Sequence, residues 1–175
     1  MNRKEIHKEI RRISKNHNKC ECFICKTQEN VQNHHIIKVD TLTNIAYMNG
    51  YNTSEKISQM YIPTVDLCEE CHKKVHSLML DNYIEPKIDY KDFLSVIDII
   101  DMVDYKKFPN DLFEDYIEAT ERLTGTVIFN LLEYGEFTSE ELETINEIIE
   151  EMERREENDI IRSYWRSKRE ETKYI

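Results

Sequence analysis

The chain has 175 residues, which fits one medium-sized domain or two small ones. Hydrophobic residues make up 39% of the sequence and charged residues 34%, so any core is small and a staple such as a metal ion is expected. No stretch approaches the ~18 apolar residues of a membrane span, and the charged N-terminal segment lacks the apolar run of a signal peptide. These features predict a cytoplasmic protein without a membrane partner.

The charge is divided unevenly along the chain. Residues 1–80 contain 12 basic and 9 acidic residues, a net charge of +3, whereas residues 81–175 contain 12 basic and 26 acidic residues, a net charge of −14. All six histidines and all five cysteines lie in residues 1–80. We therefore expect two parts, with a boundary near residues 80–86.

The first part combines short elements of both kinds. Ile6, Ile10 and Ile13 form a narrow apolar stripe that predicts a basic helix over residues 2–17. Residues 29–39 favour a short β-hairpin, and the polar residues 40–60 favour a loop with one helical turn near residues 55–60. Residues 64–67 are expected to be extended. A helix follows over residues 68–79.

The second part is predicted to be an all-α module with helices over about 90–105, 109–134 and 138–170. Gly135 is a plausible end for the middle helix, and Thr138 with Glu141 resembles a capping box at the start of the last helix. Beyond Arg154 the apolar face of that helix thins. A partner helix or a frayed end is therefore expected there.

Two Cys-x-x-Cys pairs are the strongest motif in the chain. Cys22 and Cys25 form the first pair, and Cys68 and Cys71 form the second. Each pair places two thiolates on a tight turn, so together they predict a tetrahedral Zn²⁺ site, which is structural because four cysteines leave no open coordination position. Cys20 lies beside the first pair; it could substitute as a ligand, but a spectator thiol is the better prediction.

Four histidines accompany the zinc motif. His72 and His76 are four residues apart and so share one face of a helix, where they could bind one divalent ion. His34 or His35 could add a third ligand, leaving the other free to act as a base. A surface position is the alternative for each histidine and the better prediction for His76 taken alone.

The segments CFIC (22–25), NHHII (33–37) and LCEECHKKVH (67–76) together resemble an HNH endonuclease of the treble-clef, ββα-metal type. The resemblance covers residues 22–76. It implies an α+β fold, with a small zinc-stabilised ββα-metal domain in residues 1–80 followed by the helical module in residues 81–175. In that family His34 would bind the catalytic metal, His35 would be the general base, and His72 with His76 would complete the metal site.

One position departs from the family pattern. Pro63 stands five residues before the third zinc cysteine, where the family usually has an asparagine that helps to fix the loop carrying the base. Asn44, Asn49 and Asn52 are the candidates to take its place.

The implied reaction is hydrolysis of phosphodiester bonds in DNA. Imidazole ligands suit Zn²⁺ or Ni²⁺, whereas the family often works with Mg²⁺ or Mn²⁺, so the catalytic ion stays open. DNA binding requires positive charge near the site. The N-terminal helix also has a simpler interpretation, in which its isoleucines pack on the zinc domain and its charges are only solvated. The candidate nucleic-acid contacts are Arg11, Arg12, Lys15, Lys73 and Lys74.

The acidic helices leave three roles open. They could form a homodimer or dock the nuclease on a protein partner, or they could restrain its basic surface. The third possible role is that of an inactive scaffold: the HNH fold would not cleave DNA, and its acidic helices would mimic nucleic acid and inhibit a protein partner, as an anti-defence protein would. A plain solvated helical bundle is equally compatible. The resemblance also suggests a phage or mobile-element origin, which for a phage protein implies the host cytoplasm.

Overall fold

The computed structural model describes residues 1–15, 21–79 and 90–171, with the side chains of 156 and 158–171 left out. The described residues form an α-rich structure with one two-stranded antiparallel sheet, which confirms the predicted α+β class. The elements in chain order are α1 (Arg3–Ser14), β1 (Val31–His35), α2 (Val39–Met48), α3 (Ser54–Ser58), β2 (Thr64–Cys68), α4 (Glu69–Leu78), α5 (Tyr90–Ile100), η1 (Tyr105–Lys107), η2 (Asn110–Leu112), α6 (Phe113–Tyr134) and α7 (Ser139–Glu171).

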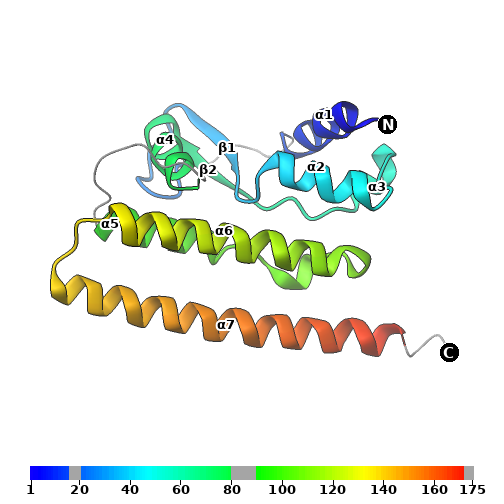
Figure 1. Ribbon diagram of the computed structural model, residues 1–175. Coiled ribbons are helices and arrows are strands. Elements are labelled where there is room, and N and C mark those ends of the chain that lie inside the picture. The colour runs from blue at the N-terminus through cyan, green and yellow to red at the C-terminus, as the bar shows by residue number, and fades with distance from the viewer. Residues whose placement is uncertain (16–20, 80–89, 172–175) are drawn as a thin grey trace.

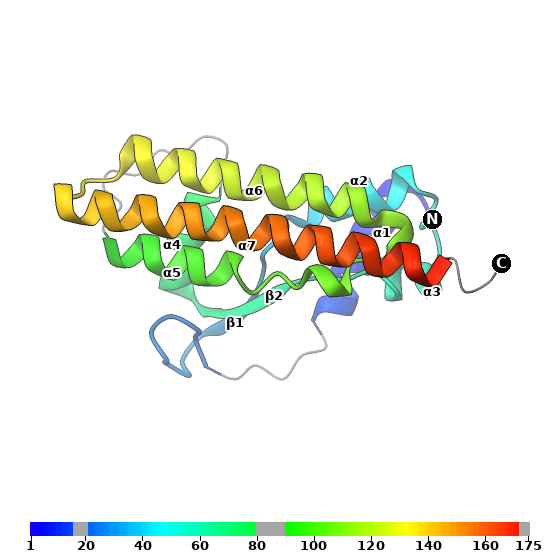
Figure 2. The same ribbon diagram turned by 90° about the horizontal axis from the view of Figure 1, so that it is seen from below.

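The helices are arranged in layers (Figure 1). The sheet lies in one layer with α1 to α4, α5 and α6 lie beneath it, and α7 covers these two on the side away from the sheet. Seen from below, α5, α7 and α6 run side by side (Figure 2). The buried side chains of both parts of the chain, from Ile6 on α1 to Met152 on α7, belong to one hydrophobic cluster.

The N-terminal helix α1 forms as its isoleucine stripe predicts. Asn2 caps it: the Asn2 side chain accepts from the backbone N–H of Glu5, and the Glu5 carboxylate accepts from the backbone N–H of Asn2. Ile6 and Ile10 are completely buried, and the helix packs on α2 and α3. The burial of this stripe against its neighbours fixes which face of α1 points towards the sheet.

The sheet differs from the predicted hairpin. β1 pairs with β2, from Val31 opposite Cys68 to His35 opposite Thr64, so the hairpin expected within residues 29–39 is wrong. The chain after His35 bends directly into α2, so the first part of the loop expected over residues 40–60 is helical instead. The short helix α3 confirms the helical turn expected near residues 55–60. Leu42 and Ala46 are four residues apart and completely buried, and α2 packs on α1. Burial against a distant segment therefore outweighs the polar composition of this stretch.

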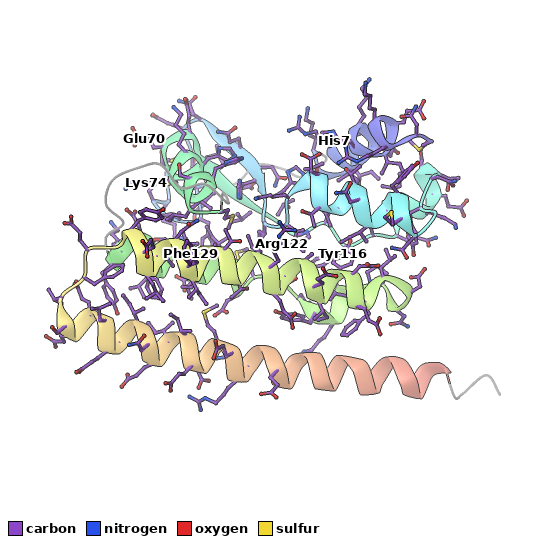
Figure 3. All side chains as sticks on the ribbon, viewed as in Figure 1. His7, Glu70, Lys74, Tyr116, Arg122 and Phe129 are labelled. Carbon is purple, nitrogen blue, oxygen red and sulfur yellow. The ribbon has the colours of Figure 1, made fainter. Side chains whose placement is uncertain are left out.

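Two hydrogen bonds tie α6 to the layer above. The Tyr116 hydroxyl donates to the carbonyl oxygen of Tyr61 in the segment before β2 (2.7 Å); Tyr116 is labelled in Figure 3. The buried Asn130 side chain donates to the carbonyl oxygen of Leu78 at the end of α4 (2.9 Å). These contacts hold α4, which carries two of the candidate site histidines, against the helical layer.

The last helix begins as predicted. The Thr138 hydroxyl accepts from the backbone N–H of Glu141 (3.2 Å), and the Glu141 carboxylate accepts from the backbone N–H of Thr138 (2.8 Å), so the capping box is present. Helix α7 then continues to Glu171 and buries Ile145 and Met152. None of the described helices is both long and apolar enough to cross a membrane.

Candidate metal centre and histidine pocket

The first cysteine pair lies on a tight turn that is fastened to the sheet. The backbone N–H of Lys26 donates to the carbonyl oxygen of Cys22 (2.9 Å), and Lys26 adopts a left-handed backbone conformation (φ 61°) that closes the turn. The backbone N–H of Phe23 donates to the carbonyl oxygen of Asp66 on β2 (2.8 Å). Because Cys68 ends β2 and α4 follows at once, this bond brings the two cysteine pairs together.

The four cysteines Cys22, Cys25, Cys68 and Cys71 are close enough together to hold a zinc ion. Their sulfur atoms all lie within 4.8 Å of one another, and the Sγ atoms of Cys25 and Cys68 are 3.6 Å apart. Four sulfurs about 2.3 Å from a tetrahedral zinc ion would lie about 3.8 Å apart. Within the described ranges, no other group of histidine, cysteine or acidic side chains is gathered this closely. The fifth cysteine, Cys20, lies outside the described residues.

The surroundings of these thiols also suit a cation. Burial raises the pKa of Cys22, but backbone N–H groups, including those of Cys25 and Cys68, lower it to about 6. Burial and the neighbouring cysteine side chains raise the pKa of Cys71 well above its usual range. One thiolate is therefore favoured and further ones resist ionisation, because negative charge would accumulate in a small volume. A divalent cation removes that conflict by binding all four thiolates.

Three imidazole rings meet between β1 and α4. The ring centroids of His34 and His72 are 4.9 Å apart, those of His34 and His76 6.0 Å, and those of His72 and His76 5.7 Å. Burial, followed by the charges of the neighbouring histidines, lowers the pKa of His34 to about 3, and burial also lowers the pKa of His72. These two rings are therefore neutral near pH 7, which is the form that binds metal ions.

The next residue of β1, His35, points the other way because successive side chains alternate across a strand. Its Nε2 lies 2.7 Å from the hydroxyl oxygen of Ser14, the last residue of α1. Burial lowers the pKa of His35 to about 4, and the positive charges of Arg11 and His7 contribute to that shift. His35 is therefore a neutral imidazole between the sheet and the basic helix.

Both groups of histidines open onto one pocket of about 470 Å³. Its walls come from α1, β1, α4 and the segment that enters α2, which lie around β1 in Figure 1. In Figure 3, His7 on α1 and Lys74 on α4 are labelled on the two sides of this region. The charged or titratable side chains that line the pocket are His7, Arg11, His34, His35, Lys38, Asp40, His72 and His76.

The five residues predicted to contact nucleic acid do not lie on one surface of the pocket. Only Arg11 of the five lines the histidine pocket. Arg12 instead donates two hydrogen bonds to Glu9 on its own helix. The Lys73 ammonium lies 2.7 Å from the Glu69 carboxylate and that of Lys74 lies 3.1 Å from the Asp92 carboxylate, whereas Lys15 is exposed at the C-terminal cap of α1.

The asparagines named as substitutes for the family asparagine do not reach the pocket in the described part of the chain. Asn44 accepts a hydrogen bond from Arg3, and Asn49 donates one to Asp115 on α6. Pro63 itself supports the end of β1 through its backbone, because its carbonyl oxygen accepts from the N–H of Ile36 (2.9 Å).

Sequence reasoning missed three residues of this site, which are His7, Ser14 and Lys38. A signal for two of them was available, since His7, Arg11 and Ser14 follow the helical spacing i, i+4, i+7 and form a polar stripe beside the isoleucine stripe. Lys38 lines the pocket only because the chain bends after β1. No local pattern announces that bend.

Comparison with known proteins adds no relative: no family model matches the chain, and no curated protein or solved structure matches it significantly.

Proposed function

We propose that this protein is a metal-dependent HNH-type endonuclease that hydrolyses phosphodiester bonds in DNA. The observation that supports the proposal is that four histidines from β1 and α4 line one pocket, three of them with their rings together and His35 on the other face of β1, in a chain whose four cysteines are able to hold a zinc ion. A zinc ion in the cysteine cluster would tie the turn before β1 to the β2–α4 junction. The elements that carry the histidines would then be held together.

The imidazoles of His34, His72 and His76 are the groups that would hold the catalytic ion. With metal–nitrogen distances of about 2.0–2.1 Å, three imidazoles around a tetrahedral ion have ring centroids about 5 Å apart. The observed separations of 4.9–6.0 Å are comparable to that value. Nε2 of His34 lies 3.5 Å from the Sδ atom of Met79, so the rings would have to turn to bring three nitrogen atoms onto one ion. When bound, the ion would stabilise negative charge on the phosphate and on the leaving oxygen.

His35 is the residue that we assign as the general base. It is neutral near pH 7, so one ring nitrogen has a free lone pair and can take a proton from water. The water oxygen forms a new bond to phosphorus while the bond from phosphorus to the 3′ oxygen breaks, and the leaving oxygen takes up a proton from solvent. Arg11 and Lys38, which line the same pocket, are positioned to neutralise the phosphate backbone.

The acidic part of the chain does not oppose this assignment. None of the residues that line the histidine pocket belongs to α5, α6 or α7, and α7 lies on the side away from the sheet (Figure 1). The acidic helix α7 is therefore separated from the pocket by the middle layer of helices. The side of α1 that lines the pocket contributes His7 and Arg11.

A plasmid-nicking assay across Mg²⁺, Mn²⁺, Ni²⁺ and Zn²⁺ tests the proposal. We expect the wild-type protein to nick DNA and His35→Ala to lose at least about 10²-fold in rate, which is the usual contribution of a general base. Each preparation must contain one structural zinc ion and show the same thermal midpoint. Absence of cleavage by a folded, zinc-loaded wild-type protein under every metal would overturn the proposal and favour the scaffold alternative.

Two neighbouring arginines provide a matched test of DNA binding. Arg11 lines the pocket, whereas Arg12 is held by Glu9. Arg11→Ala should weaken binding to all sequences and reduce the slope of log affinity against log salt concentration by about one. Arg12→Ala should change that slope less. Equal effects of the two substitutions would show that the pocket is not where the phosphate backbone binds.

A further inference from the structure

Ser14, at the end of α1, makes a buried contact with the proposed general base. Its hydroxyl oxygen lies 2.7 Å from Nε2 of His35 and 3.2 Å from the backbone carbonyl oxygen of Arg11. Ser14 is only 2% exposed, so water does not compete freely for its hydroxyl group. The geometry therefore joins a helix end, a hydroxyl and an imidazole in one short chain of hydrogen bonds.

The direction of these bonds follows from the number of available protons. The Ser14 hydroxyl has one proton to donate and can accept from a second group. The Arg11 carbonyl belongs to the last turn of α1, where carbonyl groups lack a partner further along the helix, and the backbone N–H of Lys15 turns instead to the carbonyl of Ile13. The Ser14 hydroxyl therefore donates to Arg11, as its geometry allows.

The remaining bond then defines the state of the imidazole. If the hydroxyl proton points to the Arg11 carbonyl, the Ser14 oxygen must accept, and the donor is Nε2–H of His35. A neutral imidazole carries one proton, so Nδ1 is left with a free lone pair. The opposite arrangement would put the proton on Nδ1 and would give up the bond from the Ser14 hydroxyl to the Arg11 carbonyl.

We propose that Ser14 is a positioning residue that holds His35 in the Nε2–H tautomer, so that Nδ1 is the nitrogen that accepts the proton of the attacking water. This inference rests on the proposed nuclease function and adds to it that α1 completes the active site. Ser14 itself does not touch the substrate. Its effect is to fix both the orientation and the tautomer of the base, as a hydrogen-bond partner on the second ring nitrogen generally does.

The closing experiment uses the full-length, zinc-loaded protein. ¹⁵N NMR of the histidine rings distinguishes protonated from bare nitrogens, and in the wild type we expect the proton of His35 on Nε2. In Ser14→Ala we expect a mixture of tautomers and a fall in kcat of about 10–10²-fold with little change in KM, because only the protonation geometry is disturbed. Ser14→Thr retains the hydroxyl and should restore most of the rate.

Ser95→Ala is the matched control. The Ser95 hydroxyl, on α5, also donates to a backbone carbonyl of its own helix, that of Lys91 (2.9 Å). It should leave kcat and the His35 signals unchanged. Finding the wild-type proton on Nδ1, or an unchanged kcat in Ser14→Ala, would overturn the inference while His35→Ala still supports the nuclease. If neither the wild type nor any variant cleaves DNA, the proposed function fails. The NMR result alone then decides whether Ser14 sets the tautomer of His35.

Discussion

Replacing Cys25 by serine tests whether a metal ion held by the four cysteines contributes to folding. Cys25 is the exposed member of the cysteine cluster, so the substitution disturbs little packing. Its sulfur faces that of Cys68, 43 residues along the chain. A metal ion that binds both cysteines therefore closes a long loop and lowers the entropy of the unfolded chain. Removing one of the two ligands restores that entropy and so destabilises the folded state.

The magnitude follows from the length of that loop. The chain-entropy relation used for covalent cross-links gives about 4 kcal/mol for a loop of 43 residues. For a chain of this size, about 1 kcal/mol corresponds to 2–4 °C in thermal midpoint, so Cys25→Ser should lower the midpoint by about 8–16 °C. The effect is an upper value, because three remaining thiols can retain some metal.

Two measurements on the same samples check this reasoning. Released zinc, titrated with a chromogenic chelator, should be one ion per wild-type chain and less in Cys25→Ser. Thermal unfolding followed by circular dichroism should show the midpoint difference, and a strong chelator should make the two proteins equal. A variant that keeps its zinc and its thermal midpoint, or a wild type that holds no zinc, would refute the account of a structural metal.

Two further predictions concern pH and packing. The pKa values of His34 and His35 are lowered from 6.5 to about 3 and about 4, so the unfolded chain takes up protons at a higher pH than the folded chain does. The stability that comes from the neutral rings is therefore complete above about pH 6.5 and is lost as the pH falls towards 4. His35→Gln should flatten this decline in the thermal midpoint, with the bound zinc measured at each pH. Asn130→Ala removes the buried side chain that donates to the carbonyl oxygen of Leu78 and should cost about 1–3 kcal/mol in denaturant unfolding. Thr144→Ala removes only a bond to the carbonyl oxygen of Glu140 on the same helix and should stay within about 0.5 kcal/mol.

The packing of the two faces of β1 explains why the site could be predicted only in part. His34 and His35 were both expected near a metal, yet they lie on opposite faces of the strand, one against α4 and the other against Ser14. Alternation along a strand is a local rule, but the face that meets each helix depends on how the strand is packed. The roles assigned to these histidines stay predictions until the nuclease assay is done.

Local spacing in the sequence determined those features that depend on a single turn or helix. The Cys-x-x-Cys pairs, the isoleucine stripe of α1 and the capping box at Thr138 all follow from residues within one or two turns of each other. Such patterns are readable because the backbone geometry of a turn or helix fixes which side chains share a face. The α+β class was expected from the resemblance to the HNH family, which those cysteine pairs help to carry.

Tertiary structure alone decided the pairing of β1 with β2, the helical state of residues 39–48 and the contact between Ser14 and His35. Each of these joins segments that are distant along the chain, and each depends on burying apolar side chains of α1, α2 and the sheet together. The entropy lost in closing such loops is recovered only when the whole core forms. No local pattern of residues contains that information.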